Sequence, residues 1–117
     1  MRSLVPTESQ EAETLAQYLL LMQRTGKILL YSHIPNETYT QSWSTKKRNK
    51  REGVTKGVPD YIIVTDKKVL FIELKRPKGS VTSFEQKEWI DNLSGKKTQA
   101  VVCKGWNTAK EFIEENL

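Results

Sequence analysis

The chain has 117 residues and a formal net charge of +5, from 19 Lys and Arg against 14 Asp and Glu. That length suits one domain over residues 1–117, and a hydrophobic fraction of 37% allows only a thin core. No apolar run approaches the roughly 20 residues of a membrane span, and one Cys with one His cannot form a Cys/His zinc site. We therefore expect a cytoplasmic protein without membrane contact, whose metal chemistry uses oxygen ligands.

The first half of the chain predicts one helix and one strand. Apolar residues recur at steps of three and four at Leu15, Tyr18, Leu19 and Met22. This spacing predicts a helix from about Glu8 to Arg24, capped by Thr7 or Ser9. The run Ile28–Tyr31 is typical of a short buried strand. The polar segment from Asn36 to Lys56 is long for a connection and predicts a functional or flexible loop, with its basic part at about residues 38–56.

Five positive charges lie within six residues of that loop, at Lys46, Lys47, Arg48, Lys50 and Arg51. The rest of the chain is neutral, because 14 basic residues match the 14 acidic ones. Such a run is either a solvated loop or a site for a polyanion, and we favour the polyanion because binding releases counterions. Tyr39 and Trp43 beside it either stack on bases or anchor the loop, and the sequence leaves both open.

The second half predicts, in chain order, a hairpin, a helix, a strand and a last helix. The β-rich runs Asp60–Thr65 and Val69–Lys75 form the hairpin. A capping box predicts the helix from Ser83 to about Leu93. The segment Thr98–Cys103 predicts a third β-rich strand, and Thr108-x-x-Glu111 opens the last helix. The predicted order is therefore α, β, β, β, α, β, α.

Charged residues interrupt the second strand of the hairpin. Glu73 and Lys75 share one face of this otherwise apolar strand. If Lys67 and Lys68 form a two-residue loop, Asp60 pairs with Lys75 and lies on that face as the diagonal neighbour of Glu73. Two carboxylates so placed can hold one divalent cation, and a lysine beside them suits phosphodiester hydrolysis. The alternative is an exposed face with solvated charges or ion pairs.

In the first of these interpretations Mg²⁺ is bound by Asp60 and Glu73, and the backbone carbonyl of Leu74 completes the ligand set.

Fixed spacings extend the pattern through Gly57-x-Pro59-Asp60, Glu73-x-Lys75, Gly79 and Ser83-x-x-Gln86-x-x-Trp89-x-x-x-Leu93. Over about Glu8 to Leu93 this pattern resembles the VRR-NUC domain of the PD-(D/E)xK nuclease superfamily. The resemblance implies an α/β fold with a restriction-endonuclease-like core. Its elements follow the order αβββαβ with a C-terminal helix, and helices flank a mixed central sheet.

The resemblance also implies a function. Stand-alone members, including small phage proteins, are similar to Holliday junction resolvases and tend to be homodimers. We therefore expect an endonuclease that uses Mg²⁺ or Mn²⁺ on branched or otherwise structured DNA. Asp60, Glu73 and Lys75 would be the catalytic set, with Gln86 as an additional active-site residue. The helical face of Gln86 points it toward the sheet, although a capping amide is the alternative.

Further site residues are implied by the family. It places a glutamate of the first helix near the metal, for which Glu8 is our choice and Glu11 the reserve. The segment after the first strand resembles the family's substrate-contacting segment, so His33 and Asn36 are expected near the nucleic acid. A nucleic-acid-binding module without catalysis is the competing interpretation, since the same charges could merely line a groove.

Overall fold

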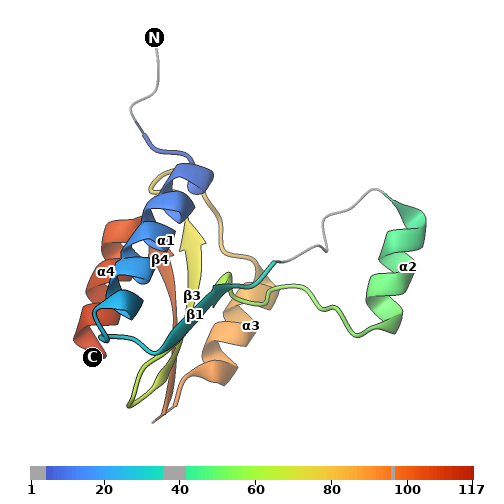
Figure 1. Cartoon of the computed structure of the whole chain (residues 1–117). Helices are drawn as coiled ribbons and strands as arrows, with labels where there is room; N and C mark the ends of the chain where they lie inside the picture. Colours follow the sequence, from blue (N-terminus) through green and yellow to red (C-terminus); the bar gives the residue numbers. More distant parts are fainter. Residues whose placement is uncertain (1–4, 36–41, 96) are drawn as a thin grey trace.

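A computed structural model describes residues 5–35, 42–95 and 97–117. The elements in chain order are α1 (Glu8–Arg24), β1 (Leu30–His33), α2 (Trp43–Arg51), β2 (Tyr61–Val64), β3 (Val69–Lys75), α3 (Phe84–Leu93), β4 (Thr98–Lys104) and α4 (Trp106–Glu115). Figure 1 shows them around one sheet, with α2 held away from it. None of the helices in the described ranges is long and apolar enough to cross a membrane.

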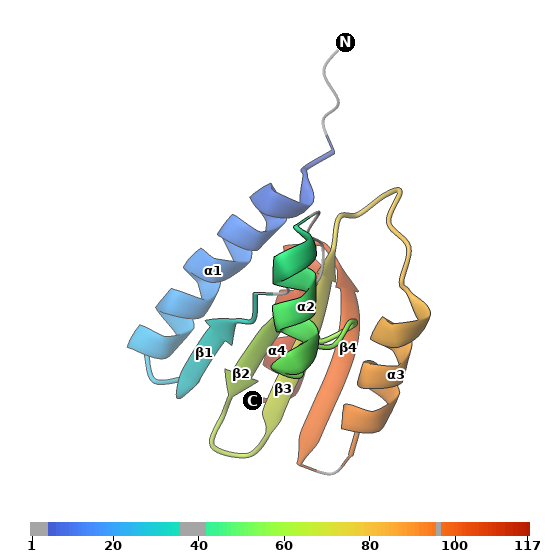
Figure 2. The ribbon, with the colours of Figure 1, turned by 90° about the vertical axis from the view of Figure 1, so that its right-hand side faces the viewer.

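The sheet has the strand order β1-β2-β3-β4. The first three strands are antiparallel neighbours, whereas β4 runs parallel to β3 after the crossover through α3. Helices α1 and α4 cover one face, and α3 lies against the other, where α2 also stands in front of the sheet (Figures 1 and 2). The predicted α/β class, the mixed sheet and the flanking helices are confirmed.

The core lies between the sheet and the pair α1 and α4. Its largest members are Leu15, Leu19, Met22, Ile28, Tyr61, Ile63, Leu70, Ile72, Leu74 and Ile113, all buried. Helix α1 has the predicted bounds, and Thr7 caps it, because its hydroxyl accepts from Gln10 N at 3.1 Å and its own N–H donates to Gln10 Oε1 at 2.9 Å. Alternation along β2 and β3 turns the other face toward α2 and α3.

The predicted hairpin is present, but its register differs by two residues from our prediction. Val64 pairs with Val69, and Thr65 N donates to the carbonyl of Lys68 at 2.9 Å. The two turn residues are therefore Asp66 and Lys67, not Lys67 and Lys68. The hydroxyl of Thr65 fixes this turn by accepting from Lys68 N at 2.9 Å. A shift of two preserves the face of every residue, so Asp60 still shares a face with Glu73.

Part of the expected loop is a helix. Ser42 caps α2 through a hydrogen bond from Thr45 N, and Lys and Arg, which are good helix formers, fill its last two turns. The predicted order therefore lacked one helix. Strand β1 also starts at Leu30 instead of Ile28, and α4 starts at Trp106 instead of Thr108, whose hydroxyl donates to a backbone carbonyl at 2.9 Å.

Candidate active site

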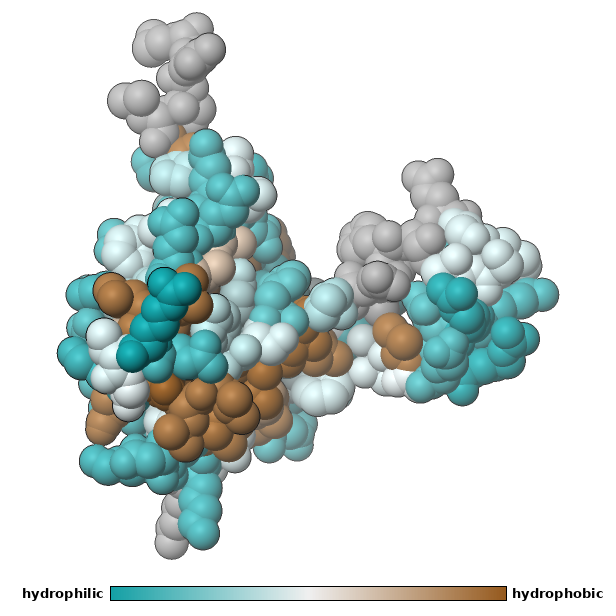
Figure 3. All heavy atoms as spheres, viewed as in Figure 1, coloured by the Kyte–Doolittle hydropathy of each residue, from teal (hydrophilic) through white to brown (hydrophobic). Residues whose placement is uncertain are grey.

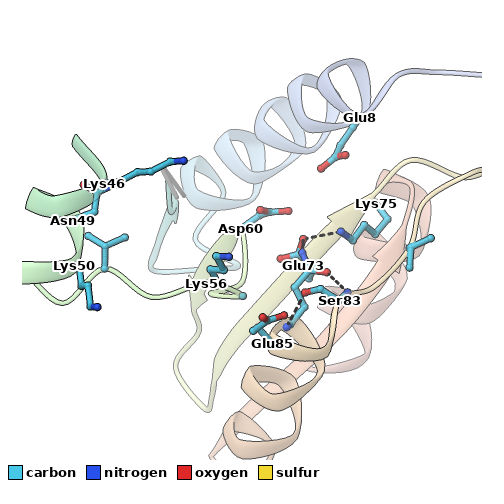
Figure 4. Close-up of a pocket in the computed structure, with 14 residues that line it drawn as sticks. Glu8, Lys46, Asn49, Lys50, Lys56, Asp60, Glu73, Lys75, Ser83 and Glu85 are labelled. Atoms are coloured by element: carbon cyan, nitrogen blue, oxygen red, sulfur yellow. Dashed lines mark hydrogen bonds and ion pairs between the residues drawn. The ribbon is translucent and has the colours of Figure 1, made fainter. Parts of the chain in front are cut away.

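A pocket of about 970 Å³ opens between α2 and the sheet face that carries Glu73. Its lining residues are Glu8, Lys46, Asn49, Lys50, Val54, Lys56, Gly57, Asp60, Glu73, Lys75, Val81, Ser83, Glu85 and Gln86. Figure 4 shows the α2 residues on one side and the carboxylates of the sheet on the other. The pocket thus combines a basic wall with an acidic floor.

Asp60 is held at the entrance to β2 by its backbone and by its carboxylate. Gly57 lies directly against the start of α3, where an added Cβ would clash with the backbone carbonyl of Glu85, and its φ is +92°. Only glycine fits this approach, which fixes the chain three residues before Asp60. The Asp60 carbonyl accepts from Ile34 N at 2.6 Å, and Oδ2 accepts from Leu74 N at 3.0 Å.

Glu73 lies opposite Asp60, because the β2–β3 register, continued by one residue, pairs them. Its side chain is buried, with a relative exposure of the residue of 3%. Oε2 accepts from Gln86 Nε2 at 3.0 Å and lies 3.5 Å from Lys75 Nζ. Oε1 is buried without a hydrogen-bond partner in the described structure. A buried carboxylate oxygen without a partner is costly, so this atom indicates a missing ligand.

Gln86 performs both roles that its sequence position allowed. Its Oε1 accepts from Ser83 N at 2.9 Å, which completes the capping box of α3. Its Nε2 donates to Glu73, as described above. The cap therefore fixes the amide so that it holds the carboxylate of the neighbouring strand.

Burial raises the pKa of both carboxyl groups. Burial, followed by the negative charge of Asp60, raises the pKa of Glu73 to about 8, against the opposing effect of Lys75. Burial also raises the pKa of Asp60, although the hydrogen bond from Leu74 N opposes this. A positive charge between these two groups would reverse both effects, because it stabilises the ionised forms.

The donor set fits a hard divalent cation. Such ions prefer carboxylate and carbonyl oxygens, and Asp60 and Glu73 present carboxylates, one with an unpartnered oxygen. The N–H of Leu74 points toward Asp60, and the carbonyl of a strand residue points to the same side as its N–H. In the described ranges no group of three or more His, Cys, Asp or Glu could hold a metal. A cation here would therefore need water or substrate oxygens to complete its shell.

The two glutamates of α1 have different surroundings. Glu8 is exposed and lines the pocket. Glu11 is buried, and its Oε2 accepts from Trp106 N at 2.7 Å, so it caps the N-terminus of α4. Glu11 thus lies on the buried stripe of α1 with Leu15, whereas Glu8, our choice for the acid near the metal, stays a prediction.

Only some of the residues expected to bind nucleic acid line the pocket. Lys46 and Lys50 line the pocket, whereas Lys47, Arg48 and Arg51 do not. Arg48 lies 3.7 Å from Glu52, and both of these side chains are exposed.

His33 pairs with Tyr61 across the β1–β2 ladder, so it lies on the sheet face opposite Asp60. Its ring centroid is 5.0 Å from that of Tyr61. Asn36 and Tyr39 lie outside the described residues.

The sequence analysis missed three further polar residues of the pocket. Lys56 precedes the Gly57 approach, and its carbonyl accepts from Trp89 Nε1 at 3.0 Å, which ties this segment to α3. Glu85 and Asn49 also line the pocket. Glu85 could have been found from its place beside Gln86 in the first turn of α3, whereas Asn49 required knowing that its segment is helical.

Comparisons with known proteins agree on one family. The model of the VRR-NUC domain matches residues 6–107. A solved structure described as a VRR_NUC domain protein is similar to this chain with a TM-score of 0.71 and 26% identity, covering 98% of this chain and 89% of that one. No curated protein matches. The chain belongs to the VRR-NUC domain family, a family of nuclease-type domains.

Proposed function

We propose that the protein is a divalent-cation-dependent DNA endonuclease whose centre is the pair Asp60 and Glu73. The observation that carries the proposal is the buried Glu73 carboxylate, with one oxygen unpartnered and the other held by Gln86 and Lys75. A structural ion pair would not leave that oxygen empty. A site whose carboxylate binds a divalent cation leaves such an oxygen free for the ion.

The residues around this centre can divide the work of phosphodiester hydrolysis. When bound, Mg²⁺ or Mn²⁺ would neutralise a phosphate oxygen and acidify water. Lys75 Nζ, beside Glu73, is placed to orient the attacking water or to stabilise negative charge on the phosphate. Gln86 keeps the Glu73 carboxylate in position. Glu8, at the pocket edge, is our candidate for an additional acid in the site.

The substrate is proposed to be DNA with a branched or otherwise irregular structure. Lys46 and Lys50 line the α2 side of the pocket, across from the carboxylates (Figure 4), and can hold phosphates of the cut strand. Lys47, Arg48 and Arg51 lie on α2 outside the pocket and can contact flanking phosphates. His33 and Asn36 stay predicted substrate contacts. Phosphate contacts carry no sequence information, so we expect selection by shape.

We further propose that the protein acts as a homodimer, because symmetric cutting of a branched DNA needs two copies. Exposed leucines at the end of α1 and at the sheet edge offer a surface for this contact, namely Leu20, Leu21, Leu29 and Leu30. Figure 3 shows apolar side chains gathered on this face. Sedimentation should give the mass of two chains, and Leu30→Glu should give one. A single-chain mass for the unaltered protein would refute the dimer.

Cleavage of a panel of labelled DNAs tests the function. The panel contains a four-way junction, a flap, a nicked duplex and a linear duplex, each with Mg²⁺, Mn²⁺ or EDTA. Asp60→Asn and Glu73→Gln should abolish cleavage with either metal while binding in EDTA persists. Asp66→Asn, an exposed acid at the hairpin turn, is the matched control and should cut normally.

Retained cleavage in Asp60→Asn or Glu73→Gln would refute the assigned site. Binding with a steep salt dependence but without product under any metal would instead support a non-catalytic binding module.

A further inference from the structure

Exposed apolar side chains surround the pocket, which is unexpected for a site that only grips phosphates. Val54 and Val81 line it, and Phe84 lies between two lining residues at the start of α3. Trp43 lies on α2, one turn before Lys46, and is 70% exposed. Lysines suffice for phosphate contacts, whereas apolar and aromatic groups contact bases.

Trp43 does not anchor α2 to any part of the chain that the structure describes. No residue of α2 is buried. The other tryptophans are packed: Trp89 donates its Nε1–H to the Lys56 carbonyl, and Trp106 packs against Tyr18 with ring centroids 6.1 Å apart. The ring contact of Trp43 in the described structure is with Lys47, whose Nζ lies 5.8 Å from the ring centroid. Of the two roles that the sequence left open, the structure thus disfavours the anchor.

The position of Trp43 on α2 places it beside the phosphate-binding lysines. Trp43 and Lys50 are seven residues apart, almost two full turns, so they lie on the same side of the helix. Lys50 and Lys46 line the pocket. An aromatic ring in line with such cations is the arrangement by which proteins bind single-stranded nucleic acid, with bases on the ring and phosphates on the cations.

We propose that Trp43 stacks on an unpaired base of the DNA and thereby makes the protein prefer DNA with unpaired nucleotides to continuous duplex. The inference rests on the proposed function for the path of the DNA through the pocket. In a duplex both faces of each base are covered by its neighbours, so the ring finds no partner there. Lys47 occupies one side of the indole as a cation–π partner, and the base stacks on the other side.

Binding in EDTA tests this inference without requiring catalysis. The probes are a fluorescent fork with unpaired arms and a duplex of the same length. Stacking on one base corresponds to about a 5- to 150-fold change in affinity. We therefore expect Trp43→Leu to weaken fork binding by at least about fivefold and duplex binding by less than twofold, while Trp43→Phe keeps most of the fork affinity. Gln17→Ala, which changes an exposed residue of α1 outside the pocket, is the matched control.

Intrinsic fluorescence gives a second readout that a loss of α2 folding would not imitate. The fork should quench tryptophan emission in the unaltered protein, and the quench should disappear in Trp43→Phe, because Trp43 is exposed on α2 whereas Trp89 and Trp106 are half-buried. Equal losses on fork and duplex, or no loss on either, would overturn the inference. If Trp43→Leu selectively loses fork binding but the unaltered protein cuts no DNA, the nuclease proposal alone is refuted. If Trp43→Leu cuts the junction normally and binds the fork as the unaltered protein does, this inference alone is refuted.

Discussion

Replacing Glu73 by glutamine should make the metal-free protein more stable at pH 8 while removing its activity. Glutamine has the shape of glutamate and can still accept the hydrogen bond from Gln86, but it cannot ionise. The substitution therefore removes the cost of holding a buried acid next to Asp60. It also removes the ion pair with Lys75, which is the weaker effect because the pKa of Glu73 is raised in spite of that lysine.

The magnitude follows from the pKa of Glu73, which rises from 4.5 in a model compound to about 8 in the folded protein. Between these pH values the folded protein holds a proton on Glu73 that the unfolded chain has released. The stability that this proton gives the folded state is therefore complete below pH 4.5 and is lost as the pH rises to about 8. One pH unit corresponds to about 1.4 kcal/mol, which gives an upper bound of about 4 kcal/mol at pH 8. Because the pocket is open to solvent, we expect roughly 1–3 kcal/mol.

Urea unfolding in EDTA at pH 5 and pH 8 measures this difference. Glu73→Gln should exceed the unaltered protein by roughly 1–3 kcal/mol at pH 8 and by much less at pH 5, and 1 kcal/mol corresponds to about 4 °C in the melting temperature. Glu85→Gln, an exposed acid of the same pocket, is the matched control and should follow the unaltered protein.

Millimolar Mg²⁺ should remove the difference in the free energy of unfolding at pH 8, because it stabilises only the protein that has Glu73. A difference of equal size at both pH values, or a less stable Glu73→Gln at pH 8, would refute the electrostatic reasoning.

Three other predictions concern single residues. Lys75→Met should lower the single-turnover cleavage rate by about 10²- to 10³-fold and leave DNA binding in EDTA within about threefold, and a smaller rate loss would deny this lysine a role in the chemistry. Gly57→Ala should lower the free energy of unfolding by more than about 2 kcal/mol, because it adds a clash with the backbone of α3 to the strain of positive φ. Gly53→Ala is the control, since Gly53 has positive φ but open space around it, and this variant should lose only about 1 kcal/mol. Equal losses in the two variants would exclude the clash. Glu11→Ala should destabilise the protein by about 1–3 kcal/mol in urea unfolding while Glu8→Ala leaves stability unchanged, and the reverse order would contradict the cap on α4.

Local signals in the sequence predicted much of the fold. Helix α1 combines a capping box with an apolar stripe, and β3 is a long β-rich run, so both were predicted at their observed bounds. The same holds for α3, where Ser83 and Gln86 form the predicted cap. These elements are specified by residues within a few positions of one another, which is the range that sequence patterns cover.

Features that depend on tertiary contacts were predicted less well. Helix α2 has no apolar stripe, so periodicity could not reveal it, although its Lys and Arg residues favour helix. The hairpin register depended on the hydroxyl of Thr65, and the start of α4 on Glu11, which lies 95 residues away in the chain. The pocket residues contributed by α2 could not be assigned before that helix was known.

Whether Asp60 and Glu73 jointly bind a cation is tested most directly by titrating the protein with Mn²⁺ and following the free ion by electron paramagnetic resonance. The unaltered protein should remove Mn²⁺ from solution, and both Asp60→Asn and Glu73→Gln should lose this binding, because each carboxylate supplies part of one ligand set. Binding in either variant with the affinity of the unaltered protein would contradict the shared site.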